Sequence, residues 1–323
     1  MDLSEIYAPV KNELSLFEAS LKAVGTGDAP WLHEPLAHAL KGGGKRLRPA
    51  LVFLSSSFYD FNLTRIMPIA LAVELMHLAT LVHDDTIDNS FERWGRPTIN
   101  KIWGMEKAVL LGDYLFAQAG EFTARTENIR VIKLLPQTLM IITNGELAQA
   151  ANTYKINISR EQYIFRVTSK TAALFIMATE SGAVLGKAPE ASIQVMHDYG
   201  LNMGIAFQII DDILDFISTE EEMGKPVGSD LLQGNATLPA MMLIERYPKD
   251  NPIRKLFEDK NADRKKLVAQ TIDMVRNSTI IQECYDIATD YSHKACDSLK
   301  KLPAKPAKES LIKLGDFIVS RRR

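Results

Sequence analysis

The sequence contains very little cysteine, and this scarcity excludes two classes of cross-linked protein. Only Cys284 and Cys296 occur among its 323 residues. Two cysteines give neither a disulfide framework nor the paired spacing of a structural zinc site. The sequence therefore predicts a reduced protein, and we expect it in the cytoplasm.

The sequence also lacks an excess of charge of one sign. It has 38 basic and 40 acidic residues, for a formal net charge of -2. Proteins that bind nucleic acid through its phosphates usually present a basic field. We therefore expect no nucleic-acid partner.

Long apolar runs are missing as well. No segment reaches the 18 uninterrupted apolar residues that suggest a membrane-spanning helix. The nearest candidate, residues 68–82, is shorter and carries Glu74 and His77. The first residues, MDLSEIYAPVKNEL, do not have the basic and then apolar regions of a signal peptide. The sequence predicts no transmembrane segment and no secretion signal.

Strand patterns are scarce, and helical periodicity dominates. No Asn-Gly or Asp-Gly turn lies between strand-like runs. Apolar residues recur at helical spacing almost everywhere. Helices are predicted over residues 5–25, 31–41, 50–60, 68–88, 101–125, 128–153, 160–186 and 190–217, with shorter ones in 237–320. Because no convincing boundary interrupts them, we predict one all-α domain over residues 1–323.

The first unusual motif is acidic and ends the helix predicted over 68–88. HDDTID places Asp84, Asp85 and Asp88 at a helix C-terminus. These carboxylates repel one another, and the helix dipole there favours cations. A bound cation would relieve both effects, and oxygen ligands favour Mg²⁺ over zinc. Taken alone, however, the motif favours a solvated acidic helix end.

The same spacing recurs in FQIIDDILDF, again at the end of an apolar helix. Its carboxylates are Asp211, Asp212 and Asp215. Two such helix ends facing each other across a cavity would form a polynuclear metal site for a polyphosphate. The repetition makes this hypothesis the stronger one.

Basic residues accompany the acidic motifs. The glycines and cations of residues 41–49, KGGGKRLRP, suit an anion cradle or, equally well, a flexible turn with a solvated basic patch. Arg93 and Arg96 follow the first acidic motif, and arginine binds two diphosphate oxygens at once. Lys170 stands among apolar neighbours and is either snorkelling or functional. Lys225 lies on a loop that would fold back over the site. The basic end, Arg321-Arg322-Arg323, suits a solvated tail.

In their order, these motifs resemble the trans-isoprenyl diphosphate synthases of the polyprenyl synthetase family. The motifs that carry the resemblance are GGGKRLRP, HDDTID with its arginine loop, Lys170-Thr171, FQIIDDILD and GKPVGSDL. The resemblance implies an all-α bundle around a deep central cavity, usually as a homodimer. It also implies a Mg²⁺-dependent, head-to-tail transfer of an allylic prenyl group onto isopentenyl diphosphate.

The resemblance assigns roles to single residues. The residues expected to bind Mg²⁺ that bridges the allylic diphosphate are Asp84, Asp85, Asp88 and Asp211, with Asp212 and Asp215 behind. The cations expected on the allylic diphosphate are Arg93, Lys170 and Lys225. Beside the developing allylic cation we expect the polar groups of Thr171 and Gln208, which with Lys170 form the catalytic set. The isopentenyl diphosphate site is expected to contain Lys45, Arg48 and His77.

The resemblance also suggests the length of the product. In this family, large aromatic residues four or five positions before the first acidic motif close the product tunnel. Here these positions hold Thr80 and Ala79, which are small, and Met76 one turn deeper would form a flexible floor. We therefore predict a product of at least twenty carbons.

Two departures from the family pattern remove expected cations. The usual pair of arginines is replaced by Arg93-Trp94, and the usual Gly-Lys is replaced by Gly234-Asn235. We expect Arg96 to supply the first missing charge at the isopentenyl diphosphate site.

Two alternative functions remain open at this point. A terpene-synthase-like enzyme of the same fold would ionise an allylic diphosphate without condensing it. Such an enzyme does not need an isopentenyl diphosphate site, so the retained Lys45, Arg48 and His77 argue against this alternative. A non-catalytic partner subunit of a heteromeric synthase would not need the two acidic motifs.

Overall fold

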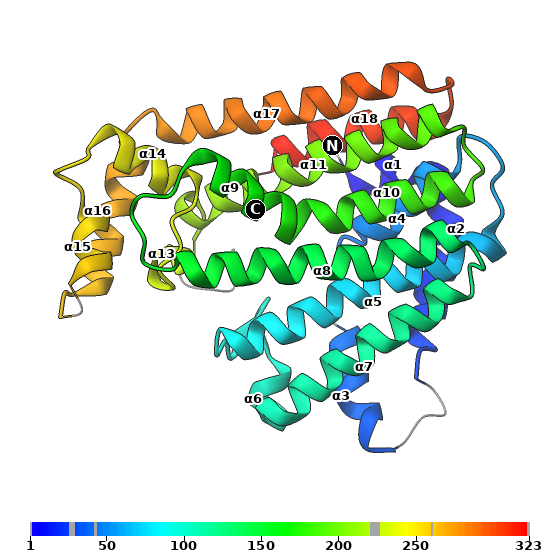
Figure 1. Cartoon of the computed structure of the whole chain (residues 1–323), viewed down its shortest axis with the longest axis horizontal. Helices are drawn as coiled ribbons and strands as arrows, with labels where there is room; N and C mark the ends of the chain where they lie inside the picture. The colour runs from blue at the N-terminus through cyan, green and yellow to red at the C-terminus, as the bar shows by residue number, and fades with distance from the viewer. Residues whose placement is uncertain (1, 26–29, 42–43, 220–226, 260, 322–323) are drawn as a thin grey trace. The chain divides into compact units, whose positions relative to one another are not determined.

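The protein is almost entirely helical in the computed structural model, which describes residues 2–25, 30–41, 44–219, 227–259 and 261–321 (Figure 1). This confirms the all-α prediction, whereas the central cavity stays a prediction. Lys225, which was expected on a loop over the site, lies outside the described residues. The elements of the first half are α1 (Leu3–Ile6), η1 (Ala8–Val10), α2 (Lys11–Lys22), α3 (Pro30–Leu40), α4 (Leu47–Ser56), α5 (Leu63–Ile87), β1 (Glu92–Arg93), β2 (Arg96–Pro97), α6 (Ile99–Trp103), α7 (Met105–Ala124) and α8 (Ile129–Asn152). Those of the second half are α9 (Arg160–Val167), η2 (Thr168–Ala172), α10 (Ala173–Leu185), α11 (Glu190–Ile217), α13 (Ser229–Leu232), α14 (Leu238–Arg246), α15 (Pro252–Glu258), α16 (Arg264–Arg276), α17 (Ile280–Ser298), η3 (Leu299–Lys301) and α18 (Pro306–Val319).

The chain divides into two compact units, each assembled from three separate segments. Unit 1 comprises Met1–Thr138, Leu174–Gly200 and Cys296–Leu314. Unit 2 comprises Leu139–Ala173, Leu201–Ala295 and Gly315–Arg323. The boundaries fall within α8, α10, α11, α17 and α18 rather than in linkers. No change of composition along the sequence could therefore have marked them, and the single domain stays a prediction.

Helix α5 is the central helix of unit 1. It begins five residues before the predicted start because the side chain of Asn62 accepts a hydrogen bond from the backbone N–H of Arg65 and caps the helix. Most residues of α5 are buried, on every face of the helix, and α5 packs along α7 (Figure 1). The imidazole of His83 fills the space at Gly112 of α7, where a Cβ would overlap the ring. This close approach fixes the C-terminal end of α5.

Two glycines bring α10 against α4 in unit 1. A Cβ at Gly182 would lie 2.5 Å from the carbonyl oxygen of Val52, and one at Gly186 would lie 2.7 Å from that of Ser56. Since the glycines are four residues apart, they share one face of α10. Any larger residue would push the two helices apart.

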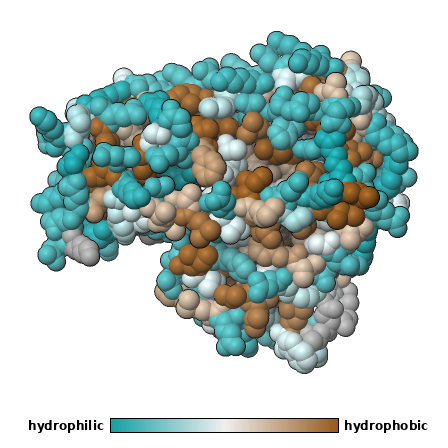
Figure 2. All heavy atoms as spheres, in the orientation of Figure 1, coloured by the Kyte–Doolittle hydropathy of each residue, from teal (hydrophilic) through white to brown (hydrophobic). Residues whose placement is uncertain are grey.

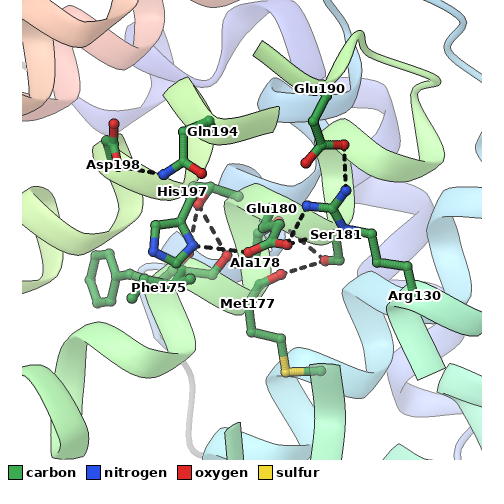
Figure 3. Close-up of polar contacts among 12 residues, drawn as sticks. Arg130, Phe175, Met177, Ala178, Glu180, Ser181, Glu190, Gln194, His197 and Asp198 are labelled. Atoms are coloured by element: carbon green, nitrogen blue, oxygen red, sulfur yellow. Dashed lines mark hydrogen bonds and ion pairs between the residues drawn. The ribbon is translucent and has the colours of Figure 1, made fainter. Parts of the chain in front are cut away.

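A polar cluster joins three helices of unit 1 (Figure 3). The carboxylate of Glu180 on α10 lies 2.9 Å from Arg130 of α8 and 3.0 Å from Nδ1 of His197 on α11. Arg130 also contacts Glu190 at 2.7 Å. Burial raises the pKa of Glu180, but the hydrogen bonds from His197 and Arg130 outweigh it and leave this pKa lowered. The same hydrogen bond raises the pKa of His197, so the cluster holds its charges as matched pairs.

In unit 2, a turn of π-helix interrupts the helix predicted over residues 160–186. This turn, η2, spans Thr168–Ala172 between α9 and α10. A Cβ at Gly145 of α8 would lie 2.6 Å from Cβ of Ser169, and one at Gly204 of α11 would lie 2.5 Å from Cα of Ala172. Gly145 and Gly204 thus let α8 and α11 pack closely on this turn. Turns of π-helix are often found at functional sites, and this one contains Lys170 and Thr171.

Candidate functional site

The first acidic motif lies at the C-terminal end of α5, where its three carboxylates have different surroundings. Asp84 is half-buried, Asp85 is buried and Asp88 is exposed. Asp88 caps the helix through its backbone N–H, which donates to the carbonyl oxygen of Asp84 at 2.8 Å. Asp84 and Asp88 are one turn apart and share a face. This face of α5 suits a cation with oxygen ligands.

Asp85 instead holds Arg93. Nε of Arg93 donates to both carboxylate oxygens of Asp85, at 3.0 and 2.9 Å, and Nη2 lies 2.8 Å from one of them. The Asp85 side chain is only 9% exposed. Such a forked contact fixes the guanidinium in one orientation. The structure therefore uses Asp85 to position the arginine that follows the motif.

The arginine loop contains a hairpin that the sequence analysis did not predict. Strands β1 and β2 pair antiparallel, with Arg93 opposite Arg96. The turn residues Trp94 and Gly95 have φ angles of +52° and +71°, as in a two-residue type I′ turn. The prediction failed because Asn-Gly or Asp-Gly usually occupies this turn. Since directly opposite residues share a face of a hairpin, Arg96 lies beside Arg93, as its expected compensating role requires.

Of the residues predicted for isopentenyl diphosphate, Arg48 and His77 act on each other. Burial lowers the pKa of His77 well below its usual value, and the charges of Arg48, Arg93 and Arg46 lower it further. The imidazole is therefore neutral and surrounded by guanidinium groups. Such a cluster attracts an anionic ligand and leaves the imidazole N–H as a neutral donor.

Arg46, which the sequence analysis did not single out, anchors the basic loop. It caps α4 with a left-handed φ of +46° and pairs with Glu18 and with buried Glu74, the latter at 2.7 Å. The hydroxyl of Tyr7 donates to the carbonyl oxygen of exposed Lys45 at 2.8 Å. These contacts attach the loop to α2 and α5. The signal was Glu74, because a carboxylate inside an apolar helix requires a cation nearby.

Two carboxylates of the second acidic motif are buried in unit 2 and bound to protein donors. Asp212 accepts hydrogen bonds from the hydroxyl of Tyr163 at 2.7 Å and from Nε2 of Gln208 at 2.8 Å. Burial raises the pKa of Asp212 to about 7. Asp215 accepts from Oγ of Ser229 at 3.0 Å. These contacts hold α9, α11 and α13 together behind Asp211.

The predicted catalytic residues of unit 2 form a short hydrogen-bonded chain. The hydroxyl of Thr171 donates to Oε1 of Gln208, whose Nε2 donates to Asp212. Both ends of the Gln208 amide are thus fixed. Nζ of Lys170 lies 2.8 Å from the carboxylate of Glu146 on α8. The sequence analysis did not identify Glu146, although a carboxylate on an apolar helix face was an available signal.

Asp211 is the most exposed carboxylate of the second motif, and its partner was not predicted. Nη1 of Arg321 lies 3.1 Å from its Oδ1, and the guanidinium lies 4.7 Å from the ring centre of Phe207. The Arg321 side chain is 12% exposed, against 36% for Asp211. The interpretation of Arg321 as part of a solvated tail was therefore wrong. An isolated run of arginines gave no signal of this contact.

A substitute cation lies beside Asn235, where the second expected lysine is missing. Nη2 of Arg166 donates to the carbonyl oxygen of Ala236 at 3.0 Å, and the guanidinium lies 5.4 Å from the ring centre of Tyr163. The charge of Arg166 also lowers the pKa of Asp212, against the larger effect of burial. Arg166 thus supplies positive charge near the position of the missing lysine.

The donor set fits a hard divalent cation. Among the residues that the structure describes, no three His, Cys, Asp or Glu side chains form a closed metal cage. Mg²⁺ does not need one, because it often binds one or two carboxylates and completes its shell with water and substrate phosphates. The half-buried or exposed oxygens of Asp84, Asp88 and Asp211 match this requirement.

The predicted chain-length residues lie on the buried part of α5. Met76 and Ala79 are completely buried, and the hydroxyl of half-buried Thr80 donates to the carbonyl oxygen of His77 at 2.7 Å. Ala79 precedes His83 by one turn and therefore shares the face that packs on α7. Their control of product length stays a prediction.

Comparisons with known proteins agree with these motifs. The family model for polyprenyl synthetase matches residues 29–275. A prenyl transferase from Synechocystis is 36% identical, covering 98% of both chains. The heptaprenyl diphosphate synthase component 2 of Bacillus subtilis is 33% identical, covering 100% of this chain and 92% of its own. A polyprenyl synthase from Caulobacter crescentus, solved with calcium and isoprenyl diphosphate, superposes with a TM-score of 0.94 at 31% identity, covering 100% and 98%.

Proposed function

Because the chain belongs to the polyprenyl synthetase family, it is a prenyltransferase, and we propose that Asp84, Asp88 and Asp211 hold the divalent ions that bind its allylic substrate. The enzyme condenses an allylic diphosphate with isopentenyl diphosphate and makes an all-trans polyprenyl diphosphate of twenty or more carbons. The remaining residues of the two motifs position these ligands and their neighbours. Buried Asp85 holds Arg93, while Asp212 and Asp215 hold Gln208 and Ser229.

The proposed chemistry begins with ionisation of the allylic C–O bond. Divalent cations held by Asp84, Asp88 and Asp211 would supply positive charge that neutralises the leaving diphosphate. Arg93, fixed by Asp85, and Lys170, oriented by Glu146, add positive charge where negative charge develops. Because the Thr171 hydroxyl donates to Gln208, its lone pairs are available to the developing allylic cation. The double bond of isopentenyl diphosphate attacks this cation and forms the new C–C bond, and the released diphosphate accepts the proton that the resulting cation loses.

The observation that favours condensation over simple ionisation is the cation cluster around His77. A terpene-synthase-like enzyme has no second diphosphate to bind. Here the charges of Arg48 and Arg93 both lower the pKa of His77, so its imidazole is neutral. Arg46 forms an ion pair with Glu74, which holds the loop before Arg48 in place. We therefore assign Arg48 and His77 to the diphosphate of isopentenyl diphosphate and keep Arg93 on the allylic diphosphate.

The test is incubation with isopentenyl diphosphate and allylic diphosphates of increasing length, with chromatographic measurement of the products. We propose Mg²⁺ as the natural ion, so chelation should stop turnover and added Mg²⁺ should restore it. Elongated diphosphates are expected. Hydrocarbons without isopentenyl incorporation would support the terpene-synthase-like alternative, and full activity in excess chelator would contradict the metal site.

Replacing Arg96 with alanine should raise KM for isopentenyl diphosphate about tenfold and change KM for the allylic substrate much less. The reason is that the hairpin places Arg96 on the same face as Arg93, next to the missing arginine. Steady-state kinetics with each substrate varied in turn measure the two constants. Arg65→Ala, which removes an exposed ion pair with Asp60, is the control.

Trp94→Arg should leave KM for isopentenyl diphosphate unchanged or lower it. Trp94 is 54% exposed at the turn, and its ring lies 5.8 Å from the Arg93 guanidinium. If neither Arg96→Ala nor Trp94→Arg changes isopentenyl kinetics, compensation by Arg96 is wrong.

We propose a homodimer on the basis of exposed apolar side chains. On α7, Met105 and Leu110 are 55% and 60% exposed, and on α8, Met140 and Leu147 are 65% exposed. Figure 2 shows hydrophobic side chains reaching the visible surface over these helices. Light scattering should give a mass about twice the 36.1 kDa of one chain. A monomer that gains activity only with a second protein would instead support a partner subunit, as the relative named component 2 suggests.

We also propose a cytoplasmic location. Both cysteines are free, as a reducing compartment requires. Helix α5 is long and apolar enough to cross a membrane, but 67% of the relevant stretch is buried inside the protein, as in a core helix. Fractionation of cells should recover the enzyme without detergent, whereas recovery only with detergent would contradict the proposal.

A further inference from the structure

Arg321 makes the least expected contact of the second acidic motif. It follows α18 in unit 2 and lies 3.1 Å from Oδ1 of Asp211 while stacking on Phe207. Its side chain is 12% exposed, whereas Arg254, in an ion pair with Glu258, is 44% exposed. Arg321 is therefore a buried part of this motif and not a surface charge near it.

Charge and stacking hold the contact, because the Arg321 nitrogen nearest Asp211 makes no hydrogen bond. Nε and Nη1 of Arg321 are buried and make no hydrogen bond. Burying such donors without an acceptor is unfavourable, because they lose their bonds to water. Arg321 is thus a suitable but incomplete partner for Asp211, and a better cation can replace it at little cost.

We propose that Arg321 is a resident counter-ion of Asp211 that an incoming divalent cation displaces. This inference rests on the proposed function, in which Asp211 is a metal ligand. The guanidinium lies at the carboxylate oxygen that a metal ion would use, and its positive charge repels that ion. The two states exclude each other, so docking of Arg321 lowers the apparent metal affinity, and metal binding releases the segment that carries Arg321.

The surroundings explain why a counter-ion is useful there. Asp211, Asp212 and Asp215 lie within two turns of α11, and the latter two are almost fully buried. Close carboxylates repel one another. Arg321 supplies positive charge to the outermost member, Asp211. The motif can therefore fold before the metal and substrate arrive.

The first experiment follows thermal unfolding of the full chain with increasing MgCl₂ at a fixed concentration of inorganic diphosphate. Compared with wild type, Arg321→Ala should melt several degrees lower in chelator and reach half of its Mg²⁺-induced stabilisation at about tenfold lower Mg²⁺. Arg321→Lys, which keeps the charge but loses the planar stacking group, should lie between them. Arg125→Ala is the matched control, because Arg125 also pairs with a glutamate and lies 4.8 Å from a phenylalanine ring centre.

The second experiment measures hydrogen exchange in residues 315–321. Mg²⁺ with inorganic diphosphate should speed exchange of this segment at least severalfold in wild type, and Phe207→Leu should speed it without the metal. Unchanged exchange in wild type would contradict displacement.

The outcomes separate this inference from the proposed function. If wild type is not stabilised by Mg²⁺ with diphosphate, the proposed metal site is wrong, and the counter-ion with it. If wild type responds and Arg321→Ala has the same Mg²⁺ midpoint, only the counter-ion is wrong. A higher midpoint for Arg321→Ala would also overturn it and would make Arg321 a ligand of the diphosphate.

Discussion

Replacing Asp84 or Asp211 with alanine should lower kcat by at least about a thousandfold while the protein still folds. Each residue is proposed to hold a metal ion that stabilises charge in the transition state, and each tenfold loss corresponds to about 1.4 kcal/mol. Asp84 is only half-buried, so its removal should cost little folding stability, whereas Asp211→Ala also removes the ion-pair partner of Arg321 and should lower Tm by several degrees without unfolding the protein. Single-turnover rates with an allylic diphosphate and isopentenyl diphosphate, together with Tm, measure both properties.

Two other substitutions sharpen this experiment. Asp286→Ala removes an exposed carboxylate from α17 and should leave kcat unchanged. Asp212→Ala should lower Tm as well as kcat, because it leaves the Tyr163 hydroxyl and the Gln208 amide without their acceptor. Losses of tenfold or less at both Asp84 and Asp211 would mean that the acidic motifs are solvated helix ends.

Ala79→Phe should shorten the product by at least one isoprene unit. A phenyl ring replaces a methyl group on a completely buried face of α5, one turn before His83, where we propose that the growing chain passes. One helical turn is about 5 Å, roughly the length of an isoprene unit. Chromatography of the products, compared with those of the wild type, measures the change.

Met76→Ala provides a control of opposite sign. If Met76 forms the floor of the path, removing its side chain should lengthen the product. Tm must be measured for both variants, because a ring that finds no space would cost about 1–3 kcal/mol by overpacking. A wild-type product of fifteen carbons would refute the open path, and an unchanged product from Ala79→Phe would show that this face does not line it.

The parts of the protein that depend on local sequence were predictable. Apolar periodicity located the long helices because amphipathic burial acts over a few turns, and α8 was found within one residue at each end. Asp84 and Asp88 share a face for the same local reason. The pairing of Thr171 with Gln208 followed only from the family resemblance, because 37 residues separate them.

The missed features depend on partners far away in the sequence. Arg46 pairs with Glu18, which is 28 residues earlier in the sequence, and with Glu74, which is 28 residues later. Arg321 lies near the last residues of the sequence and pairs with Asp211 of α11. The motif pattern alone gave Asp212 the role of a metal-bound residue. Only the fold shows that Tyr163 and Gln208 already occupy its two oxygens.

The contact of the His83 imidazole with Gly112 limits which substitutions can be used to change the product of this enzyme. Ala79 and His83 share one face of α5, so the helix face along which we propose that the product passes also carries the residue before Asp84. A larger residue at 112 would move the imidazole and, with it, the end of the helix that carries the first acidic motif. Libraries that vary α5 near Ala79 should therefore keep Gly112, because this contact holds the helix end that carries Asp84.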